Sequence, residues 1–182
     1  MKTRYLITLL LLLAMGTGAA AQNAVPDTLL FVFKLHGQTR KYQMCFTQRN
    51  DSVVLDWRIL RNLRWQKGSY TLTPAAMESG EVLSFLMPED GRKVVLSDRE
   101  TAYLISRKAY RQLKANRRLA YNCTEYEWLD NNEHVSGHAL LHVRDVQEGA
   151  EMWIWDNPAL PLVWRMKENP LEVNWEVQVL KR

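Results

Sequence analysis

The sequence predicts a mainly β protein of the β-rich α+β class, built as a single curved antiparallel sheet or half-open barrel with two short helices. Apolar and polar residues alternate through most of the chain, as they do in half-buried strands. Helix-start signals interrupt this alternation in two places. Short segments rich in Gly, Asn and Pro separate the alternating runs, and they are typical of hairpin turns.

Residues 1–21 are predicted to be a secretory signal peptide. Two basic residues precede an unbroken apolar run, and three alanines end the segment. The apolar run is shorter than the roughly 20 residues that span a bilayer, and no later run is long enough, so we expect no transmembrane segment in the mature chain. Residues 22–182 are predicted to form a single β-rich domain, exported to the periplasm or the extracellular space.

The first strands of this domain are predicted from clear alternation. The segments "TLLFVFKLH" and "RKYQMCFTQ" form a hairpin around Gly37 and Gln38, and a turn at Asn50 and Asp51 leads into "SVVLDWRIL". A short helix is then expected to begin at the N-cap Thr73, which is followed by a proline, and to end at a glycine.

The second helix is expected to begin at Ser106 and to run to Asn116. After it, the segments "AEMWIWD", "LPLVWRMK" and "LEVNWEVQVL" alternate with period two, and Asn-Pro pairs separate them. They predict an antiparallel meander at the carboxyl end of the chain.

The segment "EHVSGHALLHV" places His134, His138 and His142 at intervals of four residues. On a helix this spacing would allow a shared metal ion, but on a strand such neighbours lie about 13 Å apart. We expect a strand, with a turn at residues 130–132 before it and the histidines as an exposed polar stripe. The sequence therefore predicts no metal site and no cofactor.

Basic residues cluster in "RKAYRQLKANRR". Arg107, Arg111, Lys114 and Arg118 follow helical spacing along one side, and no acidic residue occurs between positions 101 and 124. Such a patch could meet the phosphates of a lipid, an acidic glycan or an acidic envelope protein. The alternative is a solvated helix face. The predicted signal peptide contributes two charges of the net +4, so we expect no nucleic-acid partner.

Tryptophans mark a second candidate site. "EMWIWDN" puts Trp153 and Trp155 on one face of a strand whose other face is also apolar. Such a strand is covered on both sides or lines a cavity. We expect Trp153, Trp155, Trp57 and Trp164 to line a concave surface for a lipid-like or glycan ligand. Ordinary core packing is the alternative.

The two cysteines and two of the carboxylates each allow more than one interpretation. Cys45 and Cys123 could form a disulfide in an exported protein, or remain two small buried thiols. Signals for an enzyme are weak, because the chain has no nucleophile elbow, HExxH motif or phosphate-binding loop. Asp56 and Asp156 each adjoin a tryptophan, which leaves a hydrolase with a strand carboxylate as the third hypothesis.

The segments "YLISRKAYRQL" and "MWIWDNPALPLVWRMKENPLEVNW", with the exported start, resemble small exported β-rich proteins of unknown function from Bacteroidetes-like bacteria. By architecture such proteins are similar to the half-open barrels of lipoprotein carriers, which grip a lipid or a helix. This analogy implies a fold and does not fix an activity.

The sequence thus favours an exported, non-catalytic protein that holds an apolar or amphiphilic ligand, or a segment of a partner, on a tryptophan-lined concave sheet. A cell-envelope or surface adaptor acting through the basic residues 107–118 is the first alternative.

Overall fold

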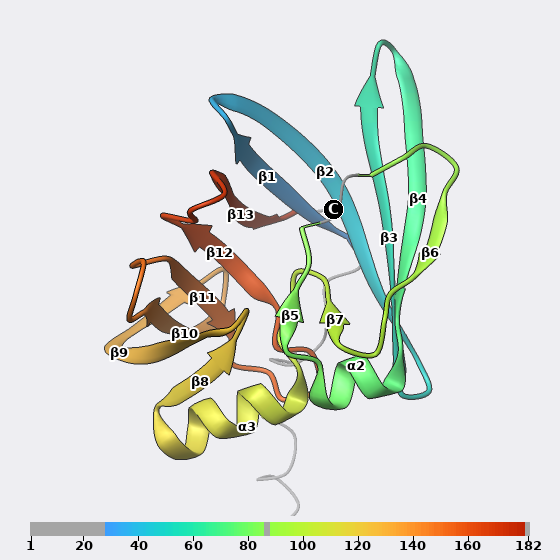
Figure 1. Cartoon of the computed structure of the whole chain (residues 1–182). Coiled ribbons are helices and arrows are strands. Elements are labelled where there is room, and N and C mark those ends of the chain that lie inside the picture. Colours follow the sequence, from blue (N-terminus) through green and yellow to red (C-terminus); the bar gives the residue numbers. More distant parts are fainter. Residues whose placement is uncertain (1–27, 86–87, 181–182) are drawn as a thin grey trace, which may run out of the picture.

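The computed structural model describes residues 28–85 and 88–180, and its dominant feature is one large curved sheet that is not closed into a barrel (Figure 1). The mainly β class and the two helices agree with the sequence prediction. The predicted signal peptide lies outside the described residues. No described helix is long and apolar enough to cross a membrane.

Eleven strands of the described chain form the large sheet, in the order β6-β4-β3-β2-β1-β13-β12-β11-β10-β9-β8. They are β1 (Leu29–Leu35), β2 (Gln38–Arg49), β3 (Ser52–Arg61), β4 (Arg64–Leu72), β6 (Lys93–Val95), β8 (Arg118–Tyr121), β9 (Thr124–Val135), β10 (His138–Asp145), β11 (Glu151–Trp155), β12 (Val163–Lys167) and β13 (Val173–Val179). Neighbouring strands are antiparallel except for the parallel pair β4 and β6, so the sheet is mixed at one edge. A second, two-stranded parallel sheet pairs β5 (Val82–Leu83) with β7 (Glu100–Thr101).

Two-residue turns connect several of the antiparallel strands. His36-Gly37, Asn62-Leu63, Asn122-Cys123 and Ser136-Gly137 each have positive φ at both positions, as in type I′ hairpins. The prediction of a turn at residues 130–132 is wrong. Strand β9 continues through these residues with a break in its register to β10, and the chain reverses at Ser136-Gly137. Glycine adopts positive φ at little steric cost, so this pair forms the tighter hairpin.

Both helices begin at the predicted residues. The Thr73 hydroxyl accepts a hydrogen bond from the Ala76 amide (3.1 Å) at the start of α2 (Pro74–Ser79). The Ser106 hydroxyl likewise caps α3 (Arg107–Asn116). These caps satisfy amide groups that the first turn of a helix leaves without a partner.

Helix α3 is fixed to the sheet by polar and apolar contacts together. Its buried residues are Ala109, Tyr110 and Leu113. The Tyr110 hydroxyl donates a hydrogen bond to the Asp156 carboxylate just after β11 (2.5 Å), and the Lys114 ammonium lies 3.0 Å from the same carboxylate. Burial, with this hydrogen bond and the negative charge of Asp156, raises the pKa of Tyr110.

The inner face of the sheet carries much of the core. On β1 the inward residues Leu29, Phe31 and Phe33 are buried, because successive side chains of a strand point to opposite faces. Helices α2 and α3 lie at one end of the curved sheet, and β5 and β7 lie across its hollow (Figure 1). The fold therefore places its apolar hollow between the sheet and the segments that cross it.

The contact between Tyr110 and Asp156 can be tested by mutation. Tyr110→Phe removes one charge-assisted hydrogen bond at a half-buried carboxylate, and we expect it to lower the free energy of unfolding by about 1–2 kcal/mol. Arg111→Gln is the matched control on the same helix. Its ion pair with Glu78 is solvent-exposed, so we expect a clearly smaller loss. Urea denaturation measures the free energy of unfolding of both variants. Equal losses would contradict a stabilising contact between Tyr110 and Asp156.

Candidate functional site

An aromatic cluster fills the centre of the concave face. The Tyr103 ring lies 5.4 Å from Phe31, 5.7 Å from Phe33 and 5.6 Å from Trp175, between ring centroids. The Phe33 ring in turn lies 5.5 Å from Tyr42, edge to face. Such edge-to-face arrangements are favoured by the aromatic quadrupole. The cluster joins strands β1, β2 and β13 to the segment that carries Tyr103.

Tyr103 adopts a left-handed backbone conformation, with φ of 60°. Its carbonyl accepts a hydrogen bond from the Val163 amide (2.8 Å), while its side chain is buried against β1 and β13. A bulky residue at positive φ is strained, and such strain persists only where the surroundings enforce it. Ring packing against β1 and β13 and a backbone hydrogen bond from β12 thus hold Tyr103 in the hollow.

A cavity of about 200 Å³ opens beside this cluster. It is lined by Phe33, Leu35, Arg40, Tyr42, Phe85, Pro88, Tyr103 and Val173. Seven of these eight side chains are apolar or aromatic. The cavity is therefore suited to the apolar part of a small molecule.

Arg40 is the charged residue of this lining. It occupies an inward position of β2, because it follows the same alternation as the buried Tyr42 and Met44. Its guanidinium donates to the Gln38 side chain (3.3 Å), and among the described residues it has no ion pair to a carboxylate. An arginine at the rim of an apolar cavity can bind the carboxylate or phosphate of a ligand.

Of the tryptophans predicted to bind a ligand, Trp57 lies on the concave face. Its ring meets Tyr42 edge to face at 6.2 Å, so it extends the aromatic cluster along β3. Trp153 lies on the other face, because it pairs with Arg165, which pairs with the outward Glu176. The predicted set is therefore divided between the two faces of the sheet.

Trp155 and Trp164 pack on each other and on His138. Their ring centroids lie 6.3 Å apart, and the His138 ring lies 4.7 Å from Trp155 and 5.0 Å from Trp164. Trp155 is 2% exposed and Trp164 is 0% exposed. These two rings pack in the interior, as the alternative interpretation of the sequence predicts.

The three histidines do not form the exposed stripe that the sequence predicted. His134 lies on β9, whereas His138 and His142 lie on β10, because the hairpin turn falls between them. His142 is 4% exposed and stacks on Trp153 at 4.0 Å, with its Nε2 3.1 Å from the Glu151 carboxylate. Among the described residues no group of three His, Cys, Asp or Glu side chains could hold a metal ion.

Burial changes the acid–base behaviour of His138 and His142. It lowers the pKa of His138, whose Nδ1 has no hydrogen-bond partner among the described residues. It also lowers the pKa of His142, although the neighbouring Glu151 acts in the opposite direction. Both imidazoles therefore favour the neutral form in the folded protein.

The predicted basic patch is largely neutralised by acidic residues from elsewhere in the chain. Arg111 pairs with Glu78 and Lys114 with Asp156. Arg118 is not on the helix, which ends at Asn116; it lies on β8 and pairs with Glu125. Arg107 alone of the predicted four has no ion pair among the described residues. These acidic partners could not be found from the local sequence, because they lie outside residues 101–124.

The two cysteines are free in this structure. Cys45 is half-buried on β2, and Cys123 is exposed in the turn between β8 and β9. These strands lie far apart in the sheet order, so the disulfide considered from the sequence is absent.

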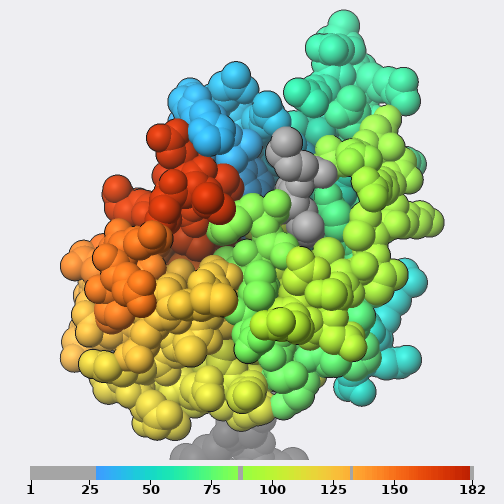
Figure 2. Space-filling model, in the orientation of Figure 1, coloured from blue at the N-terminus to red at the C-terminus, as the bar shows by residue number. Residues whose placement is uncertain are grey.

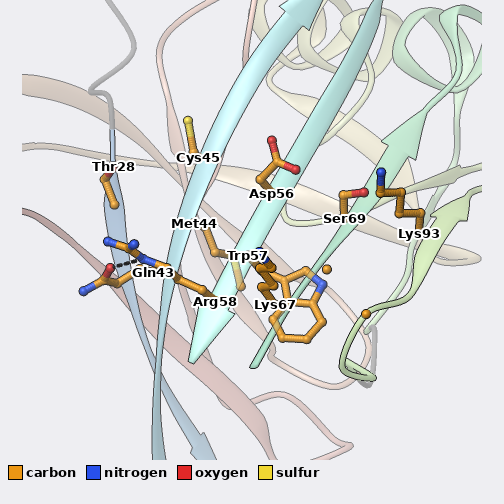
Figure 3. Close-up of a pocket in the computed structure, with 12 residues that line it drawn as sticks. Thr28, Gln43, Met44, Cys45, Asp56, Trp57, Arg58, Lys67, Ser69 and Lys93 are labelled. Atoms are coloured by element: carbon orange, nitrogen blue, oxygen red, sulfur yellow. Dashed lines mark hydrogen bonds between the residues drawn. The ribbon is translucent and has the colours of Figure 1, made fainter. Parts of the chain in front are cut away.

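A second, wider groove of about 560 Å³ crosses strands β2, β3, β4 and β6 (Figure 3). Cys45, Asp56, Ser69 and Lys93 follow one another across it in register. Two residues along the same face, the Arg58 guanidinium donates to the Gln43 side chain (2.6 Å), and Trp57, from the row between, also lines the groove. Along β2 and β3 these residues alternate with the buried residues of the core, so the groove lies mostly on the outer face.

Neither predicted carboxylate has the surroundings of a buried acid catalyst. Asp56 is exposed in this outer groove, and Asp156 is occupied by Tyr110 and Lys114. A carboxyl group needs burial among apolar groups to act as an acid near neutral pH. The structure therefore offers no support for a hydrolase built on either residue.

Sequence reasoning missed Arg40, Phe33, Tyr103 and Trp175 as site residues. A signal for Arg40 was present, since it falls two residues before Tyr42 in the same alternating strand. Tyr103 carried no such signal, because its neighbours are brought to it from strands distant in sequence.

No protein-family model matches the chain, and comparisons with curated proteins and with solved structures also give no match.

His138 leads to a prediction for pH. Its pKa is lowered by folding, so acidification through its ordinary value of about 6.5 protonates the unfolded chain first and destabilises the native state. Stability should therefore fall between pH 7.5 and pH 5. His138→Phe removes this group, and we expect a smaller fall in melting temperature over that range.

The matched control is His134→Phe, at an exposed position on the neighbouring strand. It should keep the wild-type pH dependence. Thermal unfolding followed by circular dichroism at several pH values measures both variants, and an unchanged slope for His138→Phe would contradict the prediction.

Proposed function

We propose that this protein binds an amphiphilic, lipid-like molecule with an anionic head group in the hollow of its half-open sheet. The observation that carries the proposal is Arg40, a cation without an ion pair among the described residues, at the rim of an otherwise apolar cavity. An exported carrier or sensor of such molecules, without catalysis, is the role that follows.

The apolar part of the ligand has a defined surface to contact. Phe33, Leu35 and Val173 line the cavity from the sheet, and Phe85 and Tyr103 line it from the segments that cross the hollow. The Phe85 ring lies 5.8 Å from Trp175, so the cavity is continuous with the buried aromatic cluster. Burial of an alkyl chain here contributes about 0.8 kcal/mol for each CH₂ removed from water.

The head group would be held by charge. An arginine presents several N–H donors in a planar fork and binds carboxylate or phosphate through two parallel hydrogen bonds. With no carboxylate competing for it among the described residues, the Arg40 guanidinium is free for this contact apart from its bond to Gln38. Anionic amphiphiles should thus bind more tightly than neutral ones with the same tail.

The adaptor alternative has less support. A charged surface that recruits a partner needs cations that are not already neutralised, and Arg111, Lys114 and Arg118 each have an acidic neighbour. Helix α3 instead uses Tyr110 and Lys114 to dock on the loop after β11. Its basic residues are better explained by this docking.

The cavity can be tested by filling it. Leu35→Trp places a large ring in the cavity, and we expect the affinity for dodecyl phosphate, measured by isothermal titration below its micelle concentration, to fall at least tenfold. Lys34→Trp is the matched control, because position 34 points to the opposite face of the same strand. It should bind like the wild type, and equal loss in both variants would contradict the assignment.

Arg40→Gln tests the head-group contact separately. We expect it to weaken the binding of dodecyl phosphate tenfold or more, since a hydrogen bond to a charged group contributes about 1.5–3 kcal/mol. The binding of uncharged dodecanol should not change. Absence of measurable binding of either amphiphile to the wild type would overturn the proposed function.

A further inference from the structure

The tip of the β3–β4 hairpin stands apart from the rest of the sheet. The last residue pair between β2 and β3 is Gln43 with Arg58, whereas β3 and β4 remain paired to their turn. On the other side, β6 pairs with β4 only at residues 69–71. Residues 59–66, which we name the hairpin arm, therefore form a two-stranded ribbon that projects beyond the sheet (Figures 1 and 2).

Large apolar side chains are exposed on this arm. Leu63 is 97% exposed at the tip, Leu60 is 53% exposed and Trp65 is 48% exposed. They are three of the seven large hydrophobic residues exposed in the described part of the chain. A concentration of this kind on a projecting element indicates a contact surface, because isolated hairpins are marginally stable and gain nothing from exposed apolar residues.

The turn of the hairpin arm has a strained backbone, which also indicates a contact surface. Asn62 and Leu63 have φ of 49° and 60°, the conformation of a type I′ turn. The corresponding second position is Gly37 in one hairpin and Gly137 in another. Leucine is unfavourable at this position both for its backbone and for its exposure to water. Its side chain is not explained by the stability of the fold.

The charges on the arm are basic. Arg61 and Arg64 flank the turn, Arg58 lies at the base with its guanidinium 4.9 Å from the Trp65 ring, and no acidic residue occurs between Trp57 and Lys67. Arg64 is paired with Asp90, and Arg61 has no ion pair among the described residues. Leucine and tryptophan beside arginines are typical of segments that enter the interface of an anionic bilayer.

We propose that the hairpin arm binds the surface of an anionic lipid bilayer, with Leu63 and Trp65 in the interfacial region and the arginines at the phosphates. The narrow, convex tip fits insertion between head groups. The turns of the β1–β2 and β3–β4 hairpins lie at the same end of the antiparallel meander, and Leu35 of the cavity adjoins the former. The arm would thus bring the mouth of the cavity near the bilayer. The proposal goes beyond the binding of a ligand and does not depend on it.

Vesicle flotation with the purified protein tests this inference. We expect binding to vesicles of phosphatidylcholine and phosphatidylglycerol at 7:3, and at least tenfold weaker partition to pure phosphatidylcholine. Leu63→Gly should lower partition to the anionic vesicles at least tenfold without lowering the melting temperature, because glycine suits the positive φ. Val95→Ser, at an exposed aliphatic position away from the arm, is the matched control and should bind like the wild type.

Two results would overturn the proposal. One is anionic-vesicle binding that Leu63→Gly leaves unchanged. The other is self-association of the wild type in light scattering that Leu63→Gly abolishes, with no vesicle binding, which would make a second copy of the chain the occupant. Retained binding of dodecyl phosphate by Leu63→Gly distinguishes failure of this inference from failure of the proposed cavity function.

Discussion

The pairing of the first described strand with the last one is the contact on which the rest of the structure depends. Strand β1 lies between β2 and β13, so it joins the amino-terminal hairpins to the carboxyl-terminal meander in one sheet. Phe33 lies directly opposite Trp175 in this register, with ring centroids 5.9 Å apart. Without that pairing the two halves would have exposed edges, and the hollow would lose one wall.

The two faces of the sheet are used differently along its width. Along β10 to β12 residues of both faces are buried, and histidine and tryptophan rings pack on each other, as His138 does with Trp155 and Trp164. Around β2 to β4 the outer face is polar and open, and the inner face holds Trp57 and Tyr42. The sheet is thus a packed core at one end and a half-open wall at the other.

Two strained aromatic or aliphatic residues occur where function is proposed. Tyr103 is held at positive φ in the hollow, and Leu63 adopts positive φ at the exposed tip of the hairpin arm. The surroundings of Tyr103 explain its conformation, because its ring packs on β1 and β13 and its carbonyl accepts a hydrogen bond from β12. Leu63 is 97% exposed, and the proposed contact with a lipid surface supplies a reason for its presence.

The sequence by itself determined the local elements. The alternation of "LEVNWEVQVL" and the caps at Thr73 and Ser106 depend on neighbours within a few residues, and they appear in the structure where they were expected. The turn after "TLLFVFKL" is also present, but it lies at His36-Gly37, one residue before the predicted pair Gly37 and Gln38. The inward position of Arg40 also follows from its spacing to Tyr42. Such features could be predicted because strand alternation and helix capping act over short distances.

Only the tertiary structure decided the contacts that cross the chain. The pairing of Phe33 with Trp175, the separation of Trp57 from Trp153, and the acidic partners of Arg111, Lys114 and Arg118 all join residues whose proximity no local pattern encodes. The turn at Ser136-Gly137 prevailed over residues 130–132 because the register of β9 against β10 selects one reversal. Strand order and register are set by the burial of whole faces, and that energy is summed over the complete sheet.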